Sequence, residues 1–264
     1  MSVQGYWADL PSATFGDLPD DIVAVLPLGA TEQHGPHLPL LVDSCLISAV
    51  AHQALKALDP AQSVLVLPTL SITKSDEHTS FPGTLTLSAE TLLAVLREIG
   101  ASVARAGVMR LILFNGHGGN TAVLQIAARE LRQSRNMIVA ACSWSGFADW
   151  QELYDPASYA HDIHAGDSET SAMLALRPDL VEMSKAQDFR PAMADWDTEF
   201  PYIGLAGKAA NPGWLAQDLQ PQGACGNASA ATAEKGTQLL DSAARNFAAF
   251  LAEFARFDHR RDVP

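Results

Sequence analysis

One short stretch of the sequence carries an unusual density of ionisable side chains. It covers residues 26–44 and contains Glu32, His34, His37 and Asp43. Glu32 and His34 are two residues apart, so an extended backbone points both side chains to the same side. Asp43 directly precedes a helical pattern, where free backbone amides stabilise a carboxylate and keep it ionised. These residue types could together hold a cation at a common point.

Three more candidates follow far along the chain, each at a predicted strand end or helix start: His117, His164 and Glu169. Imidazoles and carboxylates without a thiolate suit zinc, manganese or iron(II), in contrast to the all-oxygen sites of magnesium and calcium. The set is large enough for two ions, and a water between two such ions has a pKa of about 7. His164 could reach the same cleft as a general acid or base.

Each residue alone also has a simpler explanation. Asp43 and Glu169 could act only as helix-start carboxylates, and His117 could be a capping histidine in a tight turn. The run NGHGGN at residues 115–120 could instead hold an anion on its backbone amides, although it lacks the lysine and the spacing of a phosphate loop. The clustering favours a metal site, and a metal-free anion- or nucleotide-binding α/β protein is the alternative.

The elements that must position these residues alternate between apolar strands and amphipathic helices. Strands are predicted at Ile22–Leu28, Ser63–Leu67, Phe81–Leu87, Arg110–Phe114 and Met137–Trp144. Helices are predicted at Ser44–Leu58, Ser88–Ala106, Thr121–Ser134, Asp167–Leu176 and Ser229–Phe257. This alternation predicts an α/β fold with a mainly parallel sheet and helices on both faces. Ligands bind beyond the carboxyl ends of the strands in such sheets.

The bulk properties favour an acidic globular protein. With 264 residues, of which 48% are hydrophobic and 18% charged, one large domain over residues 1–264 is expected. The net charge of -13 disfavours nucleic acid and anionic membranes as partners. The chain shows neither a signal-peptide pattern nor an apolar run that would span a bilayer, so a cytoplasmic location is expected. Cys45, Cys142 and Cys225 indicate neither a disulfide framework nor a thiolate site.

Five ordered blocks between residues 22 and 236 resemble the creatininase (creatinine amidohydrolase) family. They read LPLGATEQHGPHLPLLVDS, EHTSFPGTLTL, LFNGHGGN, HAGDSETS and ATAEKG. The resemblance implies a three-layer α/β/α sandwich, a two-metal site, and hydrolysis of an amide-type C–N bond in a small molecule. It also implies assembly into homohexamers.

The resemblance extends to individual metal ligands. Glu32, Asp43 and His117 match the ligands of one metal, and His34, Asp43 and Glu169 match those of the other. Asp43 would therefore bridge the two ions. The expected cofactors are two divalent ions of Zn, Mn or Fe, because imidazole and carboxylate ligands discriminate weakly among them.

The resemblance also implies catalytic and substrate-binding residues. His164 matches the histidine that the family uses near the leaving nitrogen, and Glu169 is the second residue expected to be catalytic. Substrate contacts are expected from residues in or beside the cleft: His78, Gly118, Gly119 and Trp144. For Trp144, simple packing at a strand end is the alternative. The poorly patterned region at residues 191–227 is expected to shape specificity.

One position departs from the creatinine-hydrolysing pattern. In those members a metal-binding glutamate follows the histidine of the third block by two residues, whereas this chain has Gly119. The glycine form is similar to formamidopyrimidine-type deformylases and to the peptidase that trims the mycofactocin precursor, where a later glutamate serves instead. Glu169 matches that later position. Hydrolysis of a non-peptide or cyclic amide, or of a formamide, is therefore expected in place of creatinine hydrolysis, with a peptidase as the alternative.

Overall fold

The computed structural model describes residues 2–259 and is built around a five-stranded sheet. Its neighbouring strands all pair in parallel, in the order β1-β3-β2-β4-β5. The strands are β1 (Gln4–Tyr6), β2 (Val23–Leu28), β3 (Val64–Val66), β4 (Arg110–Asn115) and β5 (Ile138–Ser143). A separate antiparallel pair joins β6 (Asp188–Phe189) to β7 (Gly226–Asn227).

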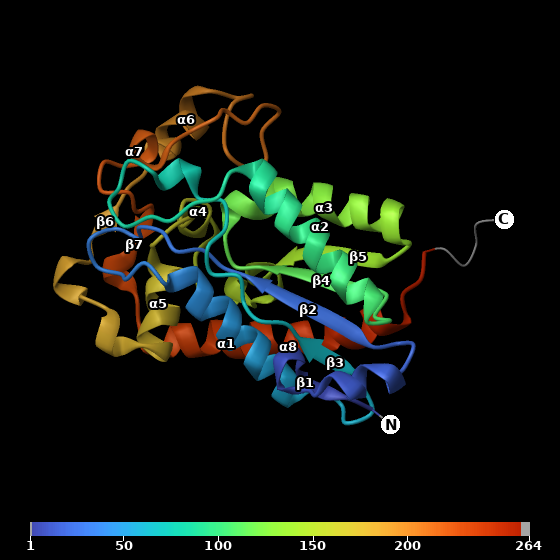
Figure 1. Cartoon of the computed structure of the whole chain (residues 1–264). Coiled ribbons are helices and arrows are strands. Elements are labelled where there is room, and N and C mark those ends of the chain that lie inside the picture. Colours follow the sequence, from blue (N-terminus) through green and yellow to red (C-terminus); the bar gives the residue numbers. More distant parts are fainter. Residues whose placement is uncertain (1, 260–264) are drawn as a thin grey trace.

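Helices cover both faces of the sheet (Figure 1). One face carries α2 (Ala89–Arg105) and α3 (Thr121–Arg135). The other carries α1 (Val42–Ala57), α5 (Asp167–Leu176) and α8 (Ala233–Arg256). Three short α-helices lie elsewhere in the described chain: α4 (Pro156–Tyr159), α6 (Met193–Glu199) and α7 (Ala216–Leu219). This is the expected three-layer α/β/α arrangement, and no helix within residues 2–259 is long and apolar enough to cross a bilayer.

The central strand β2 contributes side chains to both hydrophobic cores. Val23 and Val25 pack into the core under α1 and α8, whereas Ala24 and Leu26 pack into the core under α2 and α3. Side chains alternate between the two faces of a strand, so each helical layer receives every second residue. All six residues of β2 are buried, as expected for a parallel strand covered on both sides.

Strands β2 and β4 lie at the point where the strand order of the sheet reverses. From β2 the chain passes through α1 to β3 on one side, and then through α2 to β4 on the other side. A crevice forms beyond the carboxyl ends of the strands at such a point. Leu28 and Asn115, the last residues of the two strands, are in register. The segments that follow them carry Glu32, His34 and His117.

The predicted strand at Phe81–Leu87 is wrong. Only an isolated bridge between Thr31 and Leu85 forms there. Gly83 adopts a φ of +94°, which interrupts an extended segment. The neighbouring Thr86 accepts a hydrogen bond from the backbone of Ser75 through its hydroxyl, so this segment supports a loop instead of extending the sheet.

Three further features differ from the predictions. The edge strand β1 was not expected, because its three residues carry little periodicity and its pairing depends on β3. Helix α8 begins at Ala233 and not at Ser229, since the Thr232 side chain accepts a hydrogen bond from the backbone of Lys235 and caps the helix there. The region 191–227, expected to be irregular, contains α6, α7 and part of the β6–β7 pair.

Candidate metal centre

The five expected ligands converge beyond the carboxyl ends of β2 and β4. Glu32 and His34 follow β2, His117 follows β4, and Asp43 and Glu169 lie in the first turns of α1 and α5. Their ligand atoms form groups in which all atoms lie within 4.8 Å of one another. Two of these groups are Glu32, Asp43 and His117, and His34, Asp43 and Glu169. They are the two ligand sets that the family resemblance implies.

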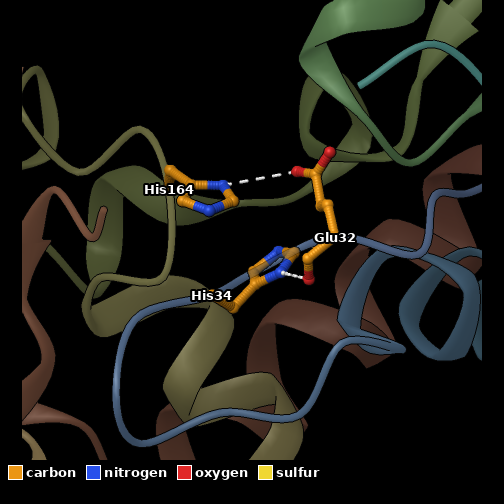
Figure 2. A group of neighbouring side chains, drawn as sticks. All are labelled: Glu32, His34 and His164. Carbon is orange, nitrogen blue, oxygen red and sulfur yellow. Dashed lines mark hydrogen bonds and ion pairs between the residues drawn. The ribbon is translucent and has the colours of Figure 1, made fainter. Parts of the chain in front are cut away.

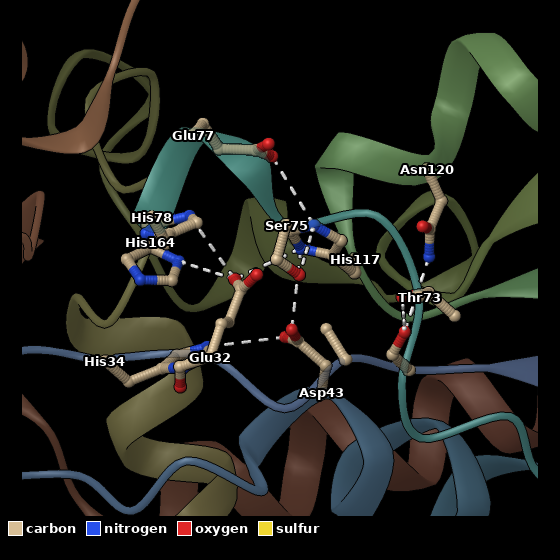
Figure 3. Close-up of polar contacts among 12 residues, drawn as sticks. Glu32, His34, Asp43, Thr73, Ser75, Glu77, His78, His117, Asn120 and His164 are labelled. Atoms are coloured by element: carbon tan, nitrogen blue, oxygen red, sulfur yellow. Dashed lines mark hydrogen bonds and ion pairs between the residues drawn. The ribbon is translucent and has the colours of Figure 1, made fainter. Parts of the chain in front are cut away.

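Asp43 lies between the two histidines. Its Oδ1 is 3.4 Å from Nε2 of His34, and its Oδ2 is 3.5 Å from Nδ1 of His117 (Figure 3). One oxygen facing each imidazole is the geometry that a bridging carboxylate requires. The N-cap residue of α1 is Leu41, so a capping role does not account for Asp43.

Glu32 is fully buried, and three imidazoles surround its carboxylate. Its Oε1 lies 3.1 Å from Nδ1 of His117, 3.4 Å from Nε2 of His78 and 3.7 Å from Nδ1 of His164. Figure 2 shows His164 approaching Glu32 from a segment far away in the sequence, with His34 beneath them. Glu32, His34 and His164 form a third group of atoms that could hold a metal.

Several buried ligand atoms in this cluster lack a hydrogen-bond partner among the described residues. They are both carboxylate oxygens of Glu32, Nε2 of His34 and Oδ2 of Asp43. Burying a carboxylate is costly unless a cation compensates its charge. Because the donor set combines imidazoles and carboxylates without a thiolate, it fits divalent ions such as Zn or Mn.

Backbone contacts orient two of the imidazoles toward the cluster. The Nδ1–H of His34 donates to the carbonyl of Glu32 at 3.0 Å, which leaves Nε2 facing Asp43. The Nε2–H of His117 donates to the carbonyl of Lys74 at 2.8 Å, which leaves Nδ1 facing Glu32. A hydrogen bond at one ring nitrogen fixes the tautomer and presents the other nitrogen to a metal.

Without a metal, protons compensate the buried charges of the cluster. Burial lowers the pKa of His34, but the Asp43 carboxylate outweighs it and raises that pKa to about 9. Burial likewise opposes charge on His117, yet Glu32 holds its pKa well above the usual range. Burial raises the pKa of Glu169 to about 7, although the charge of His34 opposes the shift. A metal entering the site would therefore displace protons.

His164 is held as a neutral imidazole beside the cluster. Burial and the charges of His34 and His78 keep its pKa well below the usual range. Its Nε2–H donates to the carbonyl of Gln33 at 2.7 Å, so Nδ1 carries the free lone pair and faces Glu32. This nitrogen can accept a proton from a group bound in the cluster.

Sequence reasoning missed Gln33, which links three parts of the site. Its side-chain amide donates to the carbonyl of Gly223 at 2.9 Å and to Nδ1 of His78 at 2.7 Å, and it lies 3.2 Å from Nε2 of His164. It also missed Asn115, whose amide donates to the carbonyl of His117 at 2.6 Å. Their positions next to candidate ligands were the only signal, since such contacts depend on the folded chain.

Two residues singled out in the sequence stay outside the ligand groups. His37 pairs through Nε2 with the hydroxyl of Thr170 at 2.9 Å, one residue beyond Glu169. Trp144 is 5% exposed and packs in the core under α1 and α8. It also lines a cavity of about 310 Å³ together with Glu169.

A larger cavity of about 510 Å³ also borders His117. The expected substrate contacts His78, Gly118 and Gly119 line it, together with His164. Its outer wall comes mainly from the region 191–227. The apolar residues of this wall are Ile163, Leu205, Pro212, Trp214 and Leu215.

Fold and site together define an α/β/α protein with a buried carboxylate and histidine centre suited to divalent metals. The family model for creatininase, described as creatinine amidohydrolase, matches residues 8–251. The chain belongs to the creatininase family of amidohydrolases.

Relatives with different activities are similar to this chain. The "Mycofactocin precursor peptide peptidase" of Mycobacterium ulcerans (strain Agy99) is 34% identical over 242 residues, covering 88% of this chain and 86% of the relative. The "Creatinine amidohydrolase" of Pseudomonas putida is 34% identical over 249 residues, covering 88% and 90%. The solved structure "Creatininase Mn" has a TM-score of 0.76 at 30% identity and covers 97% of this chain and 100% of its own. Another solved creatininase is described as a Zn-Zn type.

Proposed function

We propose that this chain is a two-metal amidohydrolase that cleaves a C–N bond in an amide other than creatinine. The observation that carries the proposal is the pair of buried ligand groups that share Asp43. The buried oxygens of Glu32 and Asp43 that lack a hydrogen-bond partner support it, because bound cations would compensate their charge. The same carboxylates argue against an anion-binding loop at this place.

In this proposal Glu32, Asp43 and His117 hold one ion, and His34, Asp43 and Glu169 hold the other. Two divalent ions of Zn, Mn or Fe, when bound, would polarise an amide carbonyl and lower the pKa of a water to about 7. The family supports this choice, since its solved structures include Mn and Zn forms.

His164 would carry the proton that the reaction must move. Since its imidazole is neutral, Nδ1 can first take a proton from the attacking water and then deliver it to the departing nitrogen. The backbone of Gln33 keeps the ring in place during both steps, because it accepts the hydrogen bond from Nε2. Glu169, which shares a ligand group with His34 and Asp43, would help to hold the attacking water.

The larger cavity supports a substrate bigger than creatinine. Its volume of about 510 Å³ lies within the usual range for small-molecule sites, about 300–1,000 Å³. Lys74 is the only lysine or arginine among its lining residues, all of which lie in the described part of the chain, and it already pairs with Asp76 and Glu77. A substrate carboxylate would find no unpaired lysine or arginine side chain there. The apolar wall around Trp214 fits a neutral, apolar substituent instead.

Peptidase activity is the second candidate, because the relative at 34% identity from Mycobacterium ulcerans is named a peptidase. The same cavity has room for a peptide side chain against Trp214. A peptide carboxylate in this cavity would find Lys74 already paired with Asp76 and Glu77. Homohexamer formation is proposed from the family resemblance, and sedimentation of the purified protein as a monomer would remove it.

The test is a panel of cyclic amides, formamides and short peptides assayed with protein reconstituted with zinc or manganese. We expect turnover that chelators abolish and added metal restores, with release of ammonia, formate or an amino acid identifying the substrate class. Unchanged turnover after complete metal removal would contradict the proposal. A melting temperature raised by phosphate or nucleotide but unaffected by chelators would favour the metal-free alternative.

A further inference from the structure

Gly119 is enclosed so tightly that no side chain fits there. A Cβ atom at this position would lie far inside contact distance of Oε1 of Glu77 and Nε2 of His117, and 2.8 Å from the carbonyl oxygen of Lys74. The preceding Gly118 differs, because a Cβ atom there would meet nothing within 4 Å. Neither glycine has a positive φ, so the restriction at Gly119 concerns space and not backbone conformation.

Glu77 fills the space beside Gly119. Its side chain is only 11% exposed, and its Oε2 accepts a hydrogen bond from Nζ of Lys74 at 3.2 Å. Its Oε1 lies 3.4 Å from Nε2 of His117. Figure 3 shows Glu77 approaching His117 from the side opposite Asp43. A carboxylate with little solvent exposure therefore lies next to His117, a candidate metal ligand.

Hydrogen-bond acceptors surround one ring nitrogen of His117, Nε2. Its Nε2–H donates to the carbonyl of Lys74 at 2.8 Å, with Oε1 of Glu77 and Oγ of Ser75 each 3.4 Å away. Its Nδ1 points to Glu32 at 3.1 Å. Acceptors around one imidazole nitrogen fix the tautomer and raise the basicity of the nitrogen that binds metal.

We propose that Glu77 is a positioning residue for His117, and that Gly119 is required because its missing side chain makes room for Glu77. Glu77 acts through His117, since its oxygens belong to none of the ligand groups found among residues 2–259. A side chain at position 119 would displace Glu77 and press on the imidazole. A metal-binding glutamate at position 119 and the observed placement of Glu77 therefore exclude each other, and the second ion must take its carboxylate from Glu169.

This inference rests on the metal site of the proposed function but not on its substrate. It is tested by competing the metal-free protein against a chelator for Zn²⁺ and measuring both affinities. We expect Glu77→Ala and Gly119→Ala each to weaken binding at the His117 site by about 10–100-fold, the usual loss when an outer partner of a metal ligand is removed. Gly118→Ala is the matched control for the glycine and should keep both affinities.

Asp76→Ala is the matched control for the carboxylate. Asp76 also pairs with Lys74, but its side chain is 61% exposed, and among the described residues it forms no ion pair with His117, unlike Glu77. We expect this variant to bind zinc as the wild type does. Glu77→Gln keeps an acceptor oxygen and should restore part of the affinity lost in Glu77→Ala. The melting temperature of each metal-free variant checks that the fold is intact.

Two further measurements separate positioning from general support of the fold. The visible absorption of the Co²⁺ form should change in Glu77→Ala, because the geometry of His117 at its ion changes. The double variant Glu77→Ala with Gly119→Ala should lose less affinity than the product of the two single losses, since both act on His117.

Wild-type zinc affinities in both Glu77→Ala and Gly119→Ala would overturn the inference while leaving the metal site intact. An equal loss in Gly118→Ala would also overturn it. A wild-type protein that binds no zinc at all would overturn the proposed function together with the inference.

Discussion

The candidate metal centre and the outer wall of the larger cavity beside it are built in different ways. The metal floor, made of Glu32, His34, Asp43, His117 and Glu169, comes from segments that directly follow strands or begin helices, and its His117 also lines the larger cavity. The apolar wall, made of Ile163, Leu205, Pro212, Trp214 and Leu215, comes mainly from the segment between α6 and α7. Floor residues are largely buried, whereas Ile163 and Leu215 are 40% and 42% exposed.

This difference indicates that the metal floor determines the reaction, whereas the apolar wall determines which substrate is accepted. The floor is fixed by two packed cores and by in-register strands, so its geometry is determined by the whole fold. The wall depends on a segment with few regular hydrogen bonds, and such loops accept changes more easily than the elements that they cover. We therefore expect floor substitutions to abolish turnover and wall substitutions to change which amide is accepted.

The largest effect is expected for His117→Ala. The variant removes one ligand of the first ion and leaves the buried Glu32 carboxylate without its nearest imidazole. Turnover should fall by more than about 100-fold. Loss of an outer partner of a metal ligand costs about 10–100-fold, and the loss of a direct ligand should cost more. Metal content should fall from two ions to one by elemental analysis. Near-normal turnover in this variant would show that the floor does not carry the reaction.

His164→Gln should lower kcat by about 10²–10⁴-fold while both ions stay bound, because the proton carrier is lost and His164 belongs to neither of the two ligand groups that share Asp43. His161→Gln is the matched control three residues earlier. His161 pairs with Asp197 at 3.1 Å, away from the cluster, and its loss should leave kcat unchanged. Steady-state kinetics with metal analysis checks both variants. An equal loss of kcat in the two variants would contradict a specific role for His164.

Trp214→Ala should raise KM on the order of tenfold for an amide with an apolar substituent and leave KM for a small amide unchanged. Tyr202→Ala is the matched control, since Tyr202 lies on the same segment and is 72% exposed but does not line the cavity. The ratio of KM values between the two amides is the measurement. An unchanged ratio in Trp214→Ala would show that the apolar wall does not select the substrate.

The smallest effect concerns the stability of the metal-free protein. Because the pKa of His34 is raised to about 9 on folding, its contribution is complete below its ordinary pKa and is lost as the pH rises through 9. The metal-free melting temperature should therefore fall by a few degrees between pH 7 and pH 9. Bound zinc should reverse the trend, since it requires deprotonated ligands. A metal-free melting temperature that rises over this range would contradict the raised pKa of His34 in the folded protein.

The floor could be predicted from the sequence because its residues are tied to periodic elements. Helix α5 has the predicted bounds Asp167–Leu176, and the strand before His117 differs from the prediction by one residue. Parallel strands place their carboxyl ends at one edge, so residues far apart in the chain were expected to meet. The place of each ligand followed from that rule and from the resemblance to the family.

The supporting residues and the wall could not be predicted in the same way. Gln33 and Glu77 act through contacts with segments distant in the sequence, and no periodicity marks them. The segment at Phe81–Leu87 alternates like a strand but contributes threonine hydroxyls to neighbouring loops. The residues of the apolar wall follow no helix or strand periodicity, so their place beside the cavity could not be predicted from the sequence.

The most direct test of the shared floor is the zinc stoichiometry of the metal-reconstituted wild type, Asp43→Ala and Glu169→Ala. Asp43 faces both imidazoles, whereas Glu169 belongs to one ligand group. We expect two ions in the wild type, none held by Asp43→Ala, and one in Glu169→Ala. Two tightly held ions in Asp43→Ala would contradict the account, because the bridging carboxylate joins its two ligand groups into one centre.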